Sequence, residues 1–301
     1  MKRVRVTVPA TSANLGPGFD VLGLALTLEN VFELEEAEKC SVEVIGEGAA
    51  TLPRGEGNIV VQGAAAVYAT LGRPFRGLRV KQVNGIPTGR GLGSSATAWL
   101  GGMLGANALC EGGLSSELLL DLAVKEEGHP DNLAAALYGG LTIAFLEDGH
   151  VRVLKLPLSS GLRFPVLIPD FEAETVAARA VLPSQFSRED GVFNLARACI
   201  LVGALTIGRH DLLRSAMADR WHQPYRVELF PWLDGVFAAA QEAGALGWAL
   251  SGAGPSVLAV ARGEAENVAA AMLEALKRSG RSGRARILDV AELGSRVEIF
   301  S

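Results

Sequence analysis

The chain has 301 residues, of which 49% are apolar and 20% charged, and its formal net charge is −5. A chain of this length can bury a sizeable core and suits two domains better than one. Its ordinary balance of apolar and charged residues excludes extended disorder. The acidic balance, without a basic tract, argues against nucleic acid as the main partner.

The cysteines and the apolar runs indicate the compartment. Cys40, Cys110 and Cys199 lie far apart, with neither the pattern of a disulfide framework nor the spacing of a zinc site. This favours a reducing compartment. No run of about 18 uncharged apolar residues offers a membrane span, and the basic N-terminus lacks the apolar segment of a signal peptide. We therefore expect a cytoplasmic protein without a membrane partner.

The first half of the chain mixes alternating strand patterns with helical ones. Asn58 is placed to cap a helix, Ser115 or Ser116 to cap another, and Gly128 to end that second one. A tetrapeptide rich in turn residues, EDGH, predicts a hairpin. The expected strands span residues 4–8, 21–28, 31–37, 40–48, 77–84, 141–146 and 151–156, the expected helices span 58–71, 94–110, 117–127 and 132–138, and residues 9–20 are expected to form a loop.

The second half predicts a strand, several helices, a strand pair around a glycine turn, an amphipathic helix and a closing strand. This order suggests a ferredoxin-like α+β module. We place the domain boundary near residue 155, with one domain over 1–155 and another over 156–301. The expected strands span residues 164–169, 246–250, 257–261 and 284–290, and the expected helices span 173–182, two or three segments within 189–243, and 264–280.

The stretch GRGLGSSATA, residues 89–98, is the first candidate for a ligand site. It lacks the lysine of a Walker phosphate loop. Its glycine spacing fits a dinucleotide fingerprint, but four residues separate it from the preceding strand, which disfavours that interpretation. Its glycines still permit close backbone approach to a ligand, and a helix start attracts an anion. The alternative is that Ser94 or Ser95 simply caps the helix.

The stretch EEGHPDN, residues 126–132, is the second candidate. Glu126 and Glu127 end a predicted helix, where negative charge is unfavourable. A divalent metal beside a polyphosphate would compensate them, because magnesium takes one or two carboxylates together with phosphate oxygens. The alternative is a solvated helix end, with Asp131 or Asn132 capping the next helix. We expect His129 to shape the loop.

A second glycine loop, SGAGPS at residues 251–256, joins two strands, so two glycine loops are available to line one site. Together with PATSANLGPGFDVLGLAL and PTGRGLGSSAT, at residues 9–26 and 87–97, it resembles the kinases of the galactokinase, homoserine kinase, mevalonate kinase and phosphomevalonate kinase (GHMP) group. EGHPDN and TVAARAVLP, at 127–132 and 175–183, make the chain most similar to the homoserine kinases. The resemblance runs along essentially the whole chain.

This resemblance implies an α+β, two-domain GHMP kinase fold. Its N-terminal α/β domain, like that of ribosomal protein S5, would bind ATP, and its C-terminal domain would be ferredoxin-like. It implies Mg²⁺ held by Ser94 or Ser95 and by Glu127. Relatives often carry an acidic residue where this chain has Lys125, so Glu126 stays an alternative. The implied ATP-binding loop comprises Pro87, Thr88, Gly89, Arg90, Gly91, Leu92, Gly93, Ser94, Ser95, Ala96 and Thr97.

The implied reaction is transfer of the ATP γ-phosphoryl group to the side-chain hydroxyl of L-homoserine. An amino acid needs an anion for its ammonium group, which Asp20 supplies, and guanidinium groups for its carboxylate, which Arg179 and Arg226 supply. Asn132 would orient the hydroxyl, and Asn132, Asp20 and Arg179 form the predicted catalytic set. The complete implied substrate site is Asn14, Asp20, Asn132, Thr175, Arg179, Arg226, Gly252 and Gly254.

The same residue types also fit simpler interpretations. Asn14 and Asp20 suit ordinary loop turns, and Arg179 and Arg226 suit solvated surface positions. A related kinase for mevalonate or a sugar is the first alternative function, and a non-catalytic ligand sensor on the same fold is the second. Relatives suggest a homodimer. We place the adenine pocket loosely near residues 58–62 and the strand before the glycine loop.

Overall fold

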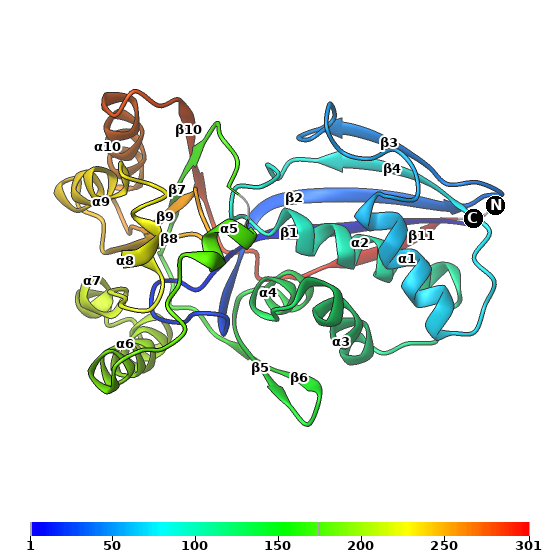
Figure 1. The fold of residues 1–301 in the computed structure, drawn as a ribbon, viewed down its shortest axis with the longest axis horizontal. Helices are drawn as coiled ribbons and strands as arrows, with labels where there is room; N and C mark the ends of the chain where they lie inside the picture. The colour runs from blue at the N-terminus through cyan, green and yellow to red at the C-terminus, as the bar shows by residue number, and fades with distance from the viewer. Residues whose placement is uncertain (1, 174, 301) are drawn as a thin grey trace.

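The computed structural model describes residues 2–173 and 175–300, apart from the side chain of Thr175. Two β-sheets lie one after the other along the long axis of the molecule, each with its own helices (Figure 1). The α+β architecture predicted from the sequence is confirmed.

The first sheet has seven strands, and helices α1–α4 lie together on one side of it (Figure 1). Its path runs β11-β1-β2-β4-β3, and the β5–β6 hairpin pairs with the start of β2. The strands are β1 (Arg3–Ala13), β2 (Leu22–Glu36), β3 (Ser41–Gly46), β4 (Leu78–Asn84), β5 (Leu141–Glu147), β6 (His150–Leu156) and β11 (Arg296–Phe300). The helices are α1 (Ile59–Thr70), α2 (Ser94–Leu109), α3 (Ser116–Glu127) and α4 (Asp131–Tyr138).

Local signals set several of these boundaries as predicted. The Asn58 side chain accepts a hydrogen bond from the Val60 amide at 2.9 Å and so caps α1. Ser115 caps α3 by accepting from the Leu118 amide. Gly128 ends α3 with a φ of 91°, which glycine adopts readily.

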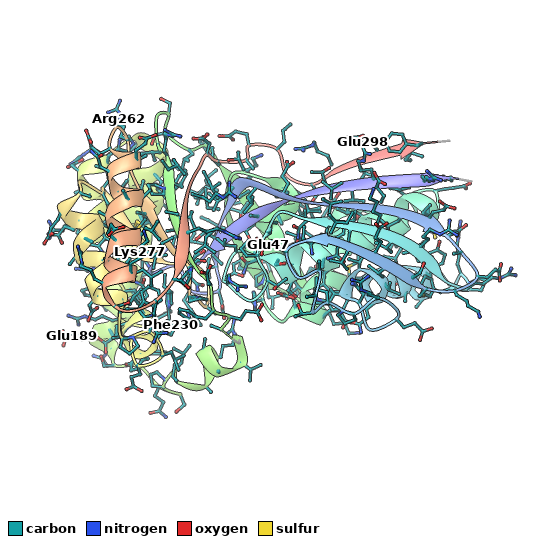
Figure 2. The ribbon with its side chains drawn as sticks, turned by 90° about the horizontal axis from the view of Figure 1, so that it is seen from above. Glu47, Glu189, Phe230, Arg262, Lys277 and Glu298 are labelled. Carbon is teal, nitrogen blue, oxygen red and sulfur yellow. The ribbon has the colours of Figure 1, made fainter. Side chains whose placement is uncertain are left out.

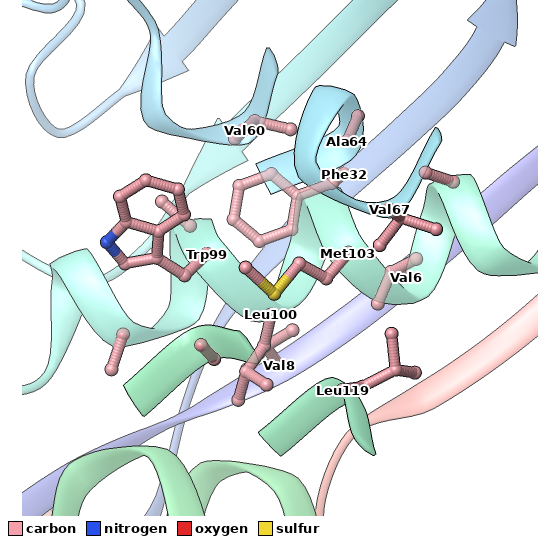
Figure 3. Packing of buried hydrophobic residues seen from close by; sticks show 14 of the residues in the cluster. Val6, Val8, Phe32, Val60, Ala64, Val67, Trp99, Leu100, Met103 and Leu119 are labelled. Carbon is pink, nitrogen blue, oxygen red and sulfur yellow. The ribbon is translucent and has the colours of Figure 1, made fainter. Parts of the chain in front are cut away.

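The core of this half lies between the sheet and its helices (Figure 3). Val6 and Val8 of β1 lie in one cluster with Phe32 of β2, the cross-strand neighbour of Val6, and with side chains of α1 and α2. Burial of these side chains is what holds the helices on the sheet. The side chains labelled in Figure 3 are Val6, Val8, Phe32, Val60, Ala64, Val67, Trp99, Leu100, Met103 and Leu119.

The second sheet has four antiparallel strands in the order β10-β7-β9-β8, the arrangement of a ferredoxin-like module. Helix α10, which carries Lys277, lies at the end of the molecule away from β11 (Figure 2). The strands are β7 (Phe164–Pro169), β8 (Gly247–Leu250), β9 (Val257–Val260) and β10 (Gly283–Leu288). The helices are α5 (Thr175–Ala180), α6 (Arg188–Ile207), α7 (Leu213–Ala216), α8 (Gln223–Arg226), α9 (Leu233–Glu242) and α10 (Ala265–Arg278), with a 3₁₀ turn at His210–Leu212.

Three expectations about strands are wrong. The predicted loop over residues 9–20 begins as strand, because β1 continues to Ala13 across a bulge between Pro9 and Ala10. The two strands expected at 21–28 and 31–37 are one long strand, β2. The strand expected to end at residue 290 is also not the last strand, since β11 follows it and pairs with β1. The domain boundary near residue 155 stays a prediction.

The two halves share a buried cluster of their own. Ala10 and Leu24 of the first sheet belong to the same apolar cluster as Phe164, Val166 and Leu258 of the second. This shared packing fixes the loops that emerge between the sheets, where the candidate site lies.

Helix α6 is the one helix in the described part of the chain that is long and apolar enough to cross a membrane by length and composition. It carries Arg197 near its middle. A single helix of this kind is weak evidence for a membrane span.

Candidate active site

A polar cleft lies where the glycine loops of the two sheets meet. It gathers segments that are far apart in the sequence: the β1–β2 loop, the start of α2, the end of α3, the start of α4, α5, α8 and the β8–β9 turn. Its lining contains most of the predicted site residues: Asn14, Asp20, Gly89, Arg90, Gly91, Gly93, Ser94, Ser95, Glu127, Asn132, Arg179, Arg226, Gly252 and Gly254.

Some predicted residues are not in this lining. Leu92, Ala96 and Thr97 are fully buried beneath the loop and support it from inside. Pro87 and Thr88 come before Gly89, which is the first residue of this loop to line the cleft. The side chain of Thr175 lies outside the part of the chain that the structure describes.

The first glycine loop has the backbone of an anion site. Gly89, Gly91 and Gly93 have φ values of 63°, 74° and 72°, in the left-handed region. Gly93 is the N-cap residue of α2, and no side chain caps that helix. The alternative that Ser94 or Ser95 caps α2 is therefore wrong. The first N–H groups of α2 remain available to an anion.

The two glycine loops touch each other. The Ser251 hydroxyl lies 2.7 Å from the Gly91 carbonyl oxygen and 2.8 Å from the Ser12 hydroxyl oxygen. A Cβ at Gly91 would collide with the Ser251 carbonyl oxygen, so the contact requires glycine. The turn at 251–256 thus fixes the position of the loop at 89–98.

Glu127 meets the start of α2. The Ser95 hydroxyl donates to Glu127 Oε2 at 2.8 Å, and both residues line the cleft. Glu126 is exposed and does not line the cleft. In the described chain no cluster of three or more His, Cys, Asp or Glu residues would hold a metal on its own. A carboxylate and a hydroxyl fit Mg²⁺ that takes its other ligands from phosphate and water.

Asp20 and Arg179 form a two-point ion pair across the cleft, with N–O distances of 2.9 and 2.7 Å. The hydrogen bond to Asp20 raises the pKa of Arg179. Asn14 holds the Asp20 loop, since its Oδ1 accepts from the Asp20 amide and its Nδ2 donates to the Gly252 carbonyl. Asn14 and Asp20 have positive φ, at 69° and 57°, which these residue types tolerate.

Arg226 is 1% exposed, so the interpretation of a solvated surface arginine is wrong for it. Its Nε donates to the Ala178 carbonyl and its Nη1 to the Gly252 carbonyl. Burial, and then the positive charge of Arg179, lower the pKa of Arg226 to about 10. The residue stays charged at neutral pH and brings a cation into the cleft.

Asn132 lies beside the glycine loop. The Thr11 hydroxyl donates to Asn132 Oδ1 at 2.7 Å, and Asp131 Oδ1 accepts from the Asn132 amide at 2.8 Å. His129 Nδ1 lies 2.8 Å from the same Asp131 oxygen. Burial lowers the pKa of His129, but the hydrogen bond to Asp131 and the nearby carboxylates outweigh it, so the pKa is raised overall.

Arg90 is anchored to the second sheet. Its guanidinium donates to the carbonyls of Pro169 and Asp170 and lies 3.2 Å from a Glu172 carboxylate oxygen. It therefore ties the loop to the end of β7, in addition to placing charge at the rim of the cleft.

Sequence reasoning missed several residues of the site. Thr11, Ser12 and Ser251 lie inside quoted motifs, but nothing in their types showed that they would bond to one another. The guanidinium groups of Arg179 and Arg226 both lie over the ring of Phe19, and Arg226 also contacts His222. The motif that contains Phe19 was a usable signal, whereas His222 had none beyond lying four residues before Arg226.

Comparisons with known proteins agree with this geometry. The family described as GHMP kinases N terminal domain matches residues 58–140, and that described as GHMP kinases C terminal matches residues 201–278. The chain is 46% identical over 275 residues to the homoserine kinase of Moorella thermoacetica, with 91% of this chain and 93% of that protein covered. It is 44% identical over 300 residues to that of Synechococcus sp., with 98% of each covered.

Solved structures also match this chain. A homoserine kinase from Cytophaga hutchinsonii superposes with a TM-score of 0.88 at 30% identity, covering 98% of this chain and 97% of that one. A mevalonate kinase from L. major, solved with R-mevalonate, has a TM-score of 0.68 at 17% identity, covering 95% of each chain. The second match shows a common fold only.

Proposed function

Because the chain belongs to the homoserine kinases of the GHMP kinase family, we propose that it transfers the γ-phosphoryl group of ATP to the side-chain hydroxyl of L-homoserine. The products are O-phospho-L-homoserine and ADP, on the route to threonine. The observation that carries the proposal is the meeting of Asp20, Arg179 and Arg226 with the glycine loop in one cleft.

The charges at one end of the cleft suit an amino acid. Asp20 would bind the ammonium group, and Arg179 and Arg226 the carboxylate. The substrate hydroxyl would then lie near Asn132, which is held between Thr11 and Asp131. A sugar or mevalonate has no ammonium group to use Asp20, so this cleft favours the amino acid over those acceptors.

The other end of the cleft suits a polyphosphate. The uncapped start of α2 and the backbone of residues 89–93 would bind the ATP phosphates. Ser95, or its neighbour Ser94, and Glu127 would hold Mg²⁺, which neutralises phosphate charge when bound. An adenine pocket near residues 58–62 and the strand before the glycine loop, β4, is part of the proposal.

The residues present support catalysis by positioning and by charge neutralisation. Asn132 orients the hydroxyl but cannot accept its proton. Asp20 is engaged by Arg179, and Asp131 Oδ1 is engaged by His129 and by the Asn132 amide. No dedicated base is therefore assigned. We also propose that the enzyme is cytoplasmic and forms a homodimer, as the family resemblance implies.

Product analysis tests the function. The protein is incubated with Mg-ATP and L-homoserine, and ³¹P NMR follows the phosphorus resonances. The proposal predicts equal amounts of ADP and a phosphate monoester whose resonance coincides with that of added O-phospho-L-homoserine. Inorganic phosphate in place of the ester would contradict it. ATP binding without turnover would favour the sensor.

A further inference from the structure

His222 is a fully buried histidine that joins two parts of the candidate site. Its Nδ1 lies 2.9 Å from Arg226 Nη1, and its Nε2 lies 2.8 Å from the Gly16 carbonyl oxygen. Gly16 belongs to the β1–β2 loop that carries Asp20. One imidazole ring therefore touches both the cation of α8 and the loop of the first sheet.

The two partners fix the protonation of this ring. A guanidinium only donates hydrogen bonds, so Nδ1 must accept from Arg226. A carbonyl oxygen only accepts, so Nε2 must carry the proton. The ring is thus neutral, with its proton on Nε2. Burial lowers the pKa of His222 to about 4, in agreement with this state.

The segment that carries this ring is held in place independently of Arg226. Asp219 accepts hydrogen bonds from the amides of Trp221, His222 and Gln223, at 2.9, 3.0 and 2.7 Å. The Phe19 ring stacks on the imidazole, with ring centroids 5.4 Å apart. The ring can therefore act as a fixed support.

One nitrogen of the Arg226 guanidinium is not engaged by these contacts. Its Nε and Nη1 donate to Ala178, Gly252 and His222, whereas no hydrogen bond to a described residue involves Nη2. Arg226 lines the cleft. Because the contacts occupy Nε and Nη1, Nη2 is the nitrogen of Arg226 that is left for a ligand in the cleft, which Arg179 and Asp20 also line.

We propose that His222 is a positioning residue for the substrate carboxylate. By accepting from Nη1 it orients Arg226, and by donating to Gly16 it ties that orientation to the loop of Asp20. The inference rests on the proposed function, because it presumes an amino-acid substrate whose carboxylate meets Arg226.

Two variants separate the two contacts. In His222→Asn the amide oxygen replaces Nδ1 and still accepts from Arg226, but the donor to Gly16 is lost. In His222→Gln the amide nitrogen reaches toward Gly16, but the acceptor for Arg226 is lost. The probe for the carboxylate is 3-aminopropan-1-ol, which is L-homoserine without that group.

The measured quantity is the KM for L-homoserine divided by the inhibition constant of 3-aminopropan-1-ol as a competitor. We expect this ratio to rise about tenfold or more in His222→Gln, because a hydrogen bond to a charged group is lost. In His222→Asn it stays within about threefold of the parent. The KM for ATP stays unchanged in both variants.

The inference is overturned if both variants keep the parental ratio, or if both lose it together with the KM for ATP, as a merely structural residue would. Turnover of L-homoserine by the parent protein is measured first, so failure of the proposed function is seen separately. Nitrogen-15 NMR of the ring gives a test independent of the variants: a proton on Nδ1 at neutral pH contradicts the inference, and one on Nε2 alone supports it.

Discussion

The guanidinium of Arg179 and the carboxylate of Asp20 form a two-point hydrogen-bonded pair that joins α5 to the β1–β2 loop. The two side chains are only partly exposed, at 38% and 33%. An amino acid carries the same two charges in the complementary order. Its ammonium group would contact Asp20 and its carboxylate would contact Arg179. A zwitterionic substrate would therefore bind to both members of the pair.

The first prediction concerns this pair. Asp20→Asn should raise the KM for L-homoserine by about tenfold or more, because a charged hydrogen bond to the ammonium group is lost. The KM for ATP should change little. Asp211→Asn is the matched control, since Asp211 forms a similar two-point pair with Arg209 on the surface. An equal rise of KM in both variants would contradict the assignment.

The second prediction concerns the glycine loop. In Gly93→Ala the new Cβ would collide with the Thr11 hydroxyl, at a φ of 72° that already disfavours a side chain. Gly112→Ala is the control, because Gly112 has a φ of 74° and open space around it. Both variants should lose about 1 kcal/mol of unfolding free energy from backbone strain. Gly93→Ala should lose at least about 1 kcal/mol more from the collision.

Urea denaturation measures both losses, and ATP titration measures the effect on the loop. We expect Gly93→Ala, and not Gly112→Ala, to weaken ATP binding. Equal stability and equal ATP affinity of the two variants would show that Gly93 is not needed for close approach.

The third prediction separates the neighbouring glutamates. Glu127 contacts Ser95, whereas Glu126 is exposed. Glu127→Gln should lower activity severely and raise the Mg²⁺ concentration for half-maximal rate by about tenfold. Glu126→Gln should stay within about twofold of the parent, as surface charges usually do. The assay is ADP release over a magnesium series. Equal activity of Glu127→Gln and the parent at limiting magnesium would refute the metal assignment.

The fourth prediction concerns pH. His222 faces Arg226 and Asp219, with Asp20 nearby in the β1–β2 loop, and burial lowers its pKa to about 4. The folded state keeps the ring neutral while the unfolded state protonates near its ordinary pKa. The contribution of the neutral His222 ring to the free energy of unfolding is therefore full above about pH 6.5. It is lost as the pH falls toward about 4.

Between about pH 7.5 and about pH 5, the parent protein should lose on the order of 2 kcal/mol more unfolding free energy than His222→Asn, which cannot titrate. Urea denaturation at the two pH values gives the difference. Parallel losses in the two proteins would mean that His222 does not titrate differently on unfolding.

Features that depend on neighbouring residues were predictable from the sequence. Asn58 and Ser115 cap helices through amides two and three residues away, and Gly128 ends a helix by its own backbone freedom. The glycine loop was identifiable for the same reason, since three glycines before a helix form a local signal.

Features that depend on distant partners were not predictable. Pro9 made residues 9–13 resemble a loop, but pairing with β2 and a bulge keep them in the sheet. β11 is exposed, and only its pairing with β1 makes it a strand. The role of His222 depends on Gly16, which lies 206 residues away in the chain. The family resemblance identified Arg226 as a site residue. The contacts that hold its side chain became visible only in the three-dimensional structure.

The most direct test of the central claim is an ADP-release assay with Mg-ATP and four acceptors: L-homoserine, mevalonate, galactose and L-threonine. The account predicts turnover with L-homoserine alone, because only that molecule matches both the charges of Asp20, Arg179 and Arg226 and the reach to Asn132. Turnover with mevalonate or galactose, and none with L-homoserine, would keep the phosphate site and contradict the amino-acid site.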